Sequence, residues 1–149
     1  MSAFDWLKKQ ISTVETELTK FKNKELMQAI VAGCAMVAYA DGNASSSEKQ
    51  KMLGFIKQSD AVKVFNTDEV ISAFSSYISK FEFDQNIGMG EAMAAVIKLK
   101  SKPEQAQLLI RVCIAIASSD GNFDADEQKA IIQMCRSLDL EPSAFDLSA

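Results

Sequence analysis

The chain has 149 residues, of which 48% are hydrophobic and 24% charged, and its formal net charge is −4. This length suits a single domain, which we expect to span residues 1–149. An acidic chain lacks the basic face that phosphate contacts require, so we expect no nucleic-acid partner. The absence of histidine excludes histidine-based catalytic triads and histidine-ligated zinc.

The chain shows no targeting or membrane-spanning segment. Its first residues lack the basic and apolar regions of a secretory signal peptide. The longest apolar stretches, residues 26–40 and 108–117, are shorter than the roughly 20 residues that span a bilayer. We therefore expect a cytoplasmic protein with reduced thiols. Cys34, Cys113 and Cys135 lie among apolar residues, which predicts that they pack in the core and take no part in chemistry.

Helical periodicity dominates the chain, and no segment alternates as a strand does. The first helix carries an apolar stripe from Phe4 to Phe21, the second spans about residues 23–40, and the third begins near Ser45 or Ser46. A capping box at residues 66–69 opens the fourth. The fifth spans residues 85–99, the sixth 103–118 and the seventh 126–138, with a further turn after Pro142. We predict an all-α fold of about seven helices in one compact domain.

Local details refine this prediction. Asp84 is expected to cap the fifth helix, whose start Gly88 and Gly90 should weaken. Pro103 suits the first turn of the sixth helix. Phe81 and Phe83, at the junction before the fifth helix, are expected to anchor the core.

An internal repeat relates residues 34–48 to residues 113–127 at a constant offset of 79. Cys, Ala, Asp, Gly, Asn and Glu coincide in the two copies. Each copy joins a very apolar helix to an amphipathic one through Asp-Gly-Asn and four further residues before Glu. The repeat predicts two related helix–loop–helix units, and an approximate two-fold packing of these units would bring their loops close together.

The two loops have a purely structural interpretation. Ser45 with Glu48, and Asp124 with Glu127, fit capping boxes, in which each side chain accepts a backbone N–H. This leaves Asp41 and Asp120 unexplained. Each follows the end of a helix, where the helix dipole disfavours an anion by roughly 0.3–1 kcal/mol.

A bound cation is the other interpretation. Asp120, Asn122 and Asp124 match the opening of a calcium loop, although the glycine and the final acid are not placed as in an EF-hand. Only oxygen donors are available, which favours calcium, magnesium or manganese over zinc or copper. Of these three ions we expect calcium, because the opening matches that of a calcium loop. The candidate metal ligands are Asp41, Asn43, Glu48, Asp120, Asn122, Asp124 and Glu127.

Residues 34–55, 63–71, 81–84 and 119–127 together resemble the TerB family of tellurite-resistance proteins, in order and at matching length. The resemblance implies a cytoplasmic helical protein of tellurite and chemical-stress resistance that works with other Ter proteins, including the membrane protein TerC. It also implies a divalent-metal site at Asp41, Glu48, Asp120 and Glu127, with Asp124 as an addition. The serines at 45–47 make the first loop less acidic than the second.

The N-terminal helix is basic: residues 1–24 carry a net charge of +2, whereas residues 120–149 carry −5. Such a helix packs its apolar stripe on the core or lies on a membrane surface, here at the inner face of the membrane. We expect a non-enzymatic binding module, because the chain offers no evident nucleophile and no phosphate-binding glycine loop. The alternatives are a metal-assisted hydrolase that uses the same carboxylates and a structural adaptor whose loops are only capped.

Overall fold

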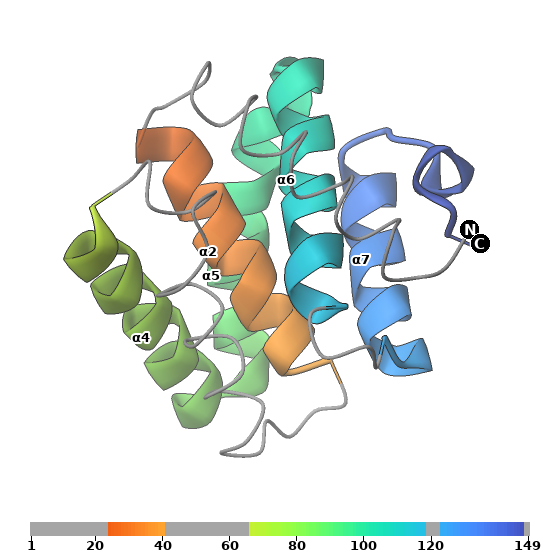
Figure 1. The fold of residues 1–149 in the computed structure, drawn as a ribbon. Coiled ribbons are helices and arrows are strands. Elements are labelled where there is room, and N and C mark those ends of the chain that lie inside the picture. The colour runs from red at the N-terminus through yellow and green to blue at the C-terminus, as the bar shows by residue number, and fades with distance from the viewer. Residues whose placement is uncertain (1–23, 41–65, 119–122, 148–149) are drawn as a thin grey trace.

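The computed structural model describes residues 24–40, 66–118 and 123–147. These ranges contain five α-helices and two 3₁₀ helices and no strand, which confirms the all-α class (Figure 1). The elements are α2 (Lys24–Ala38), α4 (Thr67–Phe83), α5 (Gln85–Ile97), η1 (Lys98–Ser101), α6 (Pro103–Ala117), α7 (Ala125–Ser137) and η2 (Pro142–Phe145). The first and third predicted helices lie outside the described residues.

Helix α2 is the central element. It packs against α4, α5, α6 and α7, and 12 of its 15 residues are buried. The sequence explains this position, because α2 is apolar on nearly every side and so has to be covered on every side. Helix α4 shows a single apolar stripe, which consists of Val70, Phe74, Ile78 and Phe81, whereas 10 of the 15 residues of α6 are buried.

The helix starts follow the predicted capping chemistry. The Asn66 side chain accepts a hydrogen bond from the backbone N–H of Glu69 at the start of α4 (3.0 Å). Asp84 accepts from the N–H groups of Asn86 (2.8 Å) and Ile87 (3.1 Å) at the start of α5. Pro103 occupies the first turn of α6, where its missing N–H costs nothing. Each cap satisfies backbone donors that the helix itself leaves unpaired.

Two details of the prediction are wrong. Phe83 does not anchor the core, since its side chain is 83% exposed whereas Phe81 is 3% exposed. The reason is the helical period: α4 continues through Phe83, so a residue two positions after Phe81 points to a different side of the helix. The fifth helix also stops being α-helical at Ile97, and the remaining turn, which buries Leu99, is a 3₁₀ helix.

Candidate functional site

The two Asp-Gly loops connect to elements that meet at one end of the bundle. Figure 1 shows α2 and α6 running toward the same, lower end, where α4 also ends and where α5 and α7 begin. Helices α2 and α6 pack against each other. They end at Ala38 and Ala117, which are separated by the same 79 residues as the sequence repeat. The acidic loops therefore leave the bundle from equivalent points of two neighbouring helices.

Helices α2 and α6 also contact each other through Cys34 and Cys113, which occupy the same position in the two copies of the repeat. A hydrogen bond with the Cys34 thiol, together with complete burial, raises the pKa of Cys113 well above its usual range. A Cβ atom added at Gly33 would lie 2.8 Å from the Cys113 Sγ atom. Contact between matching residues is expected near a two-fold axis. Each of these cysteines lies seven residues before its loop aspartate, Asp41 or Asp120.

The start of α7 contains the described part of the second loop. The Asp124 carboxylate accepts a hydrogen bond from the N–H of Glu127 (2.8 Å), and the Glu127 carboxylate accepts one from the N–H of Asp124 (3.2 Å). The Gln128 Nε2 amide donates to the carbonyl of Phe123 (2.9 Å), which fixes the approach to the helix. The predicted capping box is thus confirmed at these two residues.

The junction of α4 and α5 holds the end of α2 in place. The Tyr39 ring stacks on the Phe81 ring, with centroids 4.8 Å apart and planes 9° from parallel. The Tyr39 hydroxyl donates to the Glu82 carboxylate (3.4 Å), and the Gln85 amide donates to the Tyr39 carbonyl (3.4 Å). Because Tyr39 lies two residues before Asp41, these contacts determine where the first loop begins.

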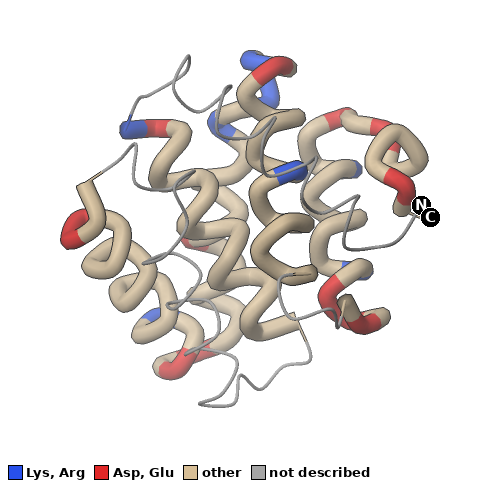
Figure 2. The backbone as a smooth tube through the Cα atoms, viewed as in Figure 1, with Lys and Arg blue, Asp and Glu red and all other residues tan. Residues whose placement is uncertain are grey.

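Glu82, which accepts the hydrogen bond from Tyr39 at this end of the bundle, was not among the predicted site residues. Tyr39 is the polar residue just before the first loop, and Glu82 is an acidic residue at the end of a predicted helix. A tyrosine hydroxyl readily donates to a carboxylate, so this pairing could have been predicted from the sequence. Figure 2 shows acidic residues at the lower ends of both α4 and α7. Asp84 uses its carboxylate to cap α5, as predicted.

The candidate ligands divide into two groups. Asp124 and Glu127 lie in the capping box, whereas Asp41, Asn43, Glu48, Asp120 and Asn122 lie outside the described residues. Within the described ranges, no group of three or more Cys, Asp or Glu side chains is arranged to hold a metal ion. The two described ligands do not form a site by themselves, and the predicted ligand set stays a prediction.

The three cysteines are free thiols and are buried, as predicted. Desolvation by burial raises the pKa of Cys135 to about 11. A thiol is nucleophilic as its thiolate, so Cys113 and Cys135 are poor nucleophiles at neutral pH. None of the helices in the described part of the chain has the length and apolarity needed to cross a membrane.

The comparisons with known proteins agree with these features. The family model described as "Tellurite resistance protein TerB" matches residues 27–149. The chain is also 47% identical over 118 residues to a tellurium resistance protein TerB from an Alcaligenes species, covering 76% of this chain and 97% of that protein. No solved structure shows significant similarity. The family model covers both Asp-Gly loops and, apart from the first three residues of α2, all the described helices. The chain therefore belongs to the TerB family of tellurite-resistance proteins.

Proposed function

We propose that this protein contributes to tellurite and chemical-stress resistance without catalysis, by binding a divalent cation at the end of the bundle where α2 and α6 terminate. Calcium is favoured over magnesium or manganese. The observation that carries the proposal is the equivalent ending of two neighbouring helices, Ala38 in α2 and Ala117 in α6. Each is followed three residues later by the aspartate of an Asp-Gly-Asn loop, Asp41 or Asp120.

The proposed ligands are all oxygen donors. Carboxylates come from Asp41, Glu48, Asp120, Asp124 and Glu127, and amide oxygens come from Asn43 and Asn122. Calcium takes six to eight oxygen ligands in flexible geometry, which suits ligands drawn from two loops. The repeat supports one shared site, because matching loops begin at matching heights on adjacent helices.

Capping does not prevent ion binding. An ionised carboxylate has about four lone-pair positions, and a capping bond uses one of them. The hydrogen bond from Glu127 to Asp124 involves the Oδ1 atom of Asp124. Asp124 can therefore cap α7 and also offer an oxygen to a cation.

The capping box supports a second candidate, a structural adaptor that binds protein partners and no ion. A hydrolase is less well supported, because the raised pKa values of Cys113 and Cys135 make these two thiols poor nucleophiles. For either non-enzymatic function, the partners we propose are the other Ter proteins, including the membrane protein TerC. Contact with the inner face of the membrane would then involve the basic N-terminal segment, residues 1–24.

The test is a titration of metal-free protein with calcium, magnesium and manganese in separate experiments, followed by amide NMR. We expect saturable shifts at residues 41–48 and 120–127, weakened in Asp120→Asn. Asp124→Asn should also weaken binding while it preserves the helix, because asparagine is an equally good N-cap. The control Asp146→Asn removes the same charge beside η2, beyond the opposite end of α7.

Each outcome separates the candidates. Binding that is lost in Asp120→Asn and kept in Asp146→Asn supports the cation site. If millimolar calcium, magnesium and manganese cause no localised shift, the cation proposal is wrong and the structural adaptor remains. Hydrolysis of phosphoesters by the metal-loaded protein, abolished in Asp120→Asn, would instead contradict the non-enzymatic assignment.

A further inference from the structure

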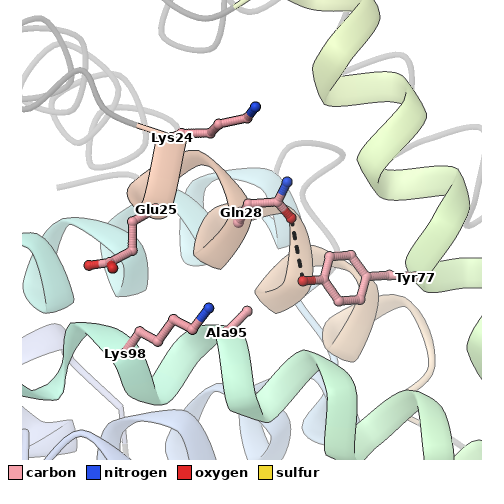
Figure 3. Close-up of a pocket in the computed structure, with 6 residues that line it drawn as sticks. All are labelled: Lys24, Glu25, Gln28, Tyr77, Ala95 and Lys98. Atoms are coloured by element: carbon pink, nitrogen blue, oxygen red, sulfur yellow. Dashed lines mark hydrogen bonds between the residues drawn. The ribbon is translucent and has the colours of Figure 1, made fainter.

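A pocket of about 270 Å³ lies between α2, α4, α5 and η1, toward the end of the bundle where α2 begins and α5 ends. It is lined by Lys24, Glu25, Gln28, Tyr77, Ala95 and Lys98 (Figure 3). Its volume is just below the range of about 300–1,000 Å³ that is typical of pockets for drug-sized ligands. The pocket therefore suits a smaller molecule.

The cations that line this pocket have no acidic partner among the described residues. Lys24 and Lys98 form no ion pair or hydrogen bond within those ranges. In Figure 3 the Lys98 ammonium group points toward Gln28, and Lys24 extends on the other side of Gln28. Two positive charges thus lie on either side of one amide group.

The amide group of Gln28 is oriented by Tyr77. The Tyr77 hydroxyl donates a hydrogen bond to the Oε1 atom of Gln28 (3.4 Å). Burial, followed by the nearby Glu91 carboxylate, raises the pKa of Tyr77, so the hydroxyl keeps the proton that it donates. With Oε1 occupied by this bond, the Nε2 group of Gln28 is the part of the amide that remains to donate to a ligand.

Two carboxylates near the pocket are neutralised by other cations, whereas Asp68 and Glu69 line an adjoining pocket that shares Lys24 and Gln28. Glu25 pairs with Lys102 (2.5 Å) on the linker between η1 and α6, and its carboxylate points away from Tyr77 in Figure 3. Glu91 pairs with Lys80 (3.5 Å), whose ammonium group also lies 5.4 Å from the centre of the Tyr77 ring. Among the residues that line this pocket, the charge left without a partner is therefore positive, although the chain as a whole is acidic.

We propose that this pocket binds a small oxyanion, held by the ammonium groups of Lys24 and Lys98 and by the Nε2 group of Gln28. Charge-assisted hydrogen bonds from two ammonium groups and one amide match the acceptor oxygens of such an anion. Ala95 and the Tyr77 ring close the apolar side of the pocket and limit the size of the ligand. The proposal is independent of the cation site, because the two sites share no residue.

The test is an NMR titration with sulfate, phosphate and tellurite in separate experiments, with sodium chloride adjusted to hold the ionic strength constant. Tellurite is included because it is the oxyanion in the family's description. We expect saturable shifts of the Gln28 side-chain amide and of backbone amides in residues 24–28 and 95–98. Lys98→Gln should weaken binding about tenfold, because it removes one charge-assisted hydrogen bond.

Matched variants make the result specific. Lys98→Arg keeps the positive charge and should bind within about threefold of the wild type, since the donor is retained. Lys129→Gln removes an exposed lysine from α7, away from the pocket, and should leave binding unchanged. The proposal is overturned if no anion gives saturable shifts at these amides, or if Lys98→Gln and Lys129→Gln weaken binding equally. Saturation by tellurite alone would support the site and identify its selectivity.

Discussion

Two glycines in α5, only two residues apart, are expected to respond in opposite ways to substitution by alanine. A Cβ atom at Gly88 would lie 2.5 Å from Cγ of Phe81 and 2.7 Å from both the Cα and N atoms of the same residue. A Cβ atom at Gly90 would have no atom within 4 Å. Both residues belong to the same helix, so the helical propensity gained on substitution is similar at the two positions.

The magnitude follows from this difference in space. Alanine is preferred over glycine inside a helix by roughly 1 kcal/mol, and Gly90→Ala should gain up to that amount. Gly88→Ala gains the same propensity, but it pushes the backbone of α4 away from α5. Overpacking of this kind costs about 1–3 kcal/mol or more, and backbone atoms yield less readily than the end of a side chain. We expect Gly88→Ala to be destabilised by about 2 kcal/mol in total.

Urea unfolding followed by circular dichroism, with thermal unfolding as a second measurement, tests this prediction. For a chain of this size, 1 kcal/mol corresponds to about 2–4 °C in Tm. Gly90→Ala should unfold at a higher temperature than the wild type, and Gly88→Ala at a temperature about 4–8 °C lower. If Gly88→Ala is as stable as Gly90→Ala, α4 and α5 are not as closely packed as the structure shows, and the reasoning is refuted.

Three further predictions concern the caps, the core and the thiols. Asp84→Ala should lower the free energy of unfolding by about 1 kcal/mol, because α5 loses its N-cap. Asp84→Asn should be nearly neutral, because asparagine also caps helices. Equal losses for the two variants in urea unfolding would contradict the capping role. Phe81→Ala should lower the free energy of unfolding by about 3–5 kcal/mol, because the Phe81 side chain is buried. Phe83→Ser should change it by no more than about 0.5 kcal/mol, because Phe83 is exposed, and a large loss of stability in this variant would contradict that exposure. The free energy of unfolding should fall as the pH rises from 9.0 to about 11. Burial raises the pKa of the Cys135 thiol from 9.0 in the unfolded chain to about 11 in the folded protein, so between these values only the unfolded state is stabilised by losing the proton. Cys135→Ala should flatten the dependence of the unfolding free energy on pH in that window, and an unchanged slope would rule out this thiol as its cause.

The sequence predicted the elements whose causes are local. The caps at Asn66, Asp84 and Asp124 arise from contacts within three residues, and all three were placed correctly. The central position of α2 was also predictable, since an apolar helix needs cover on every side. The error at Phe83 came from treating residues 81–84 as a junction, although the period of α4 continues through Phe83.

Features that depend on contacts between helices could not be predicted in this way. Gly88 was expected only to weaken α5, because nothing in the sequence shows how closely α4 approaches it. The pocket beside Gln28 requires residues from four elements, α2, α4, α5 and η1, with Lys98 separated from Lys24 by 74 positions. Neither lysine stands out in the sequence, where each is one charge on an amphipathic surface.

The charges at the ends of the helices support the proposal that the Asp-Gly loops bind a cation. The C-terminus of a helix carries about half a negative charge, and α2 and α6 end side by side at equivalent residues. The C-terminus of α4 lies at the same end of the bundle, and the N-termini of α5 and α7 are already capped by the carboxylates of Asp84 and Asp124. The helices that precede Asp41 and Asp120 in the chain therefore end in a region where the N-termini of α5 and α7 are already capped.

Specific binding of calcium and general screening by salt predict different changes in stability. If the loop aspartates only repel each other, any salt should relieve the repulsion, and calcium chloride should stabilise the protein no more than sodium chloride at equal ionic strength. If the loops form a site, calcium should raise the Tm further, in proportion to the logarithm of its concentration above Kd. Asp120→Asn should reduce this calcium-specific increment, whereas Asp146→Asn beside η2 should leave it intact. An identical response to the two salts in the wild type would show that the acidic end is merely screened.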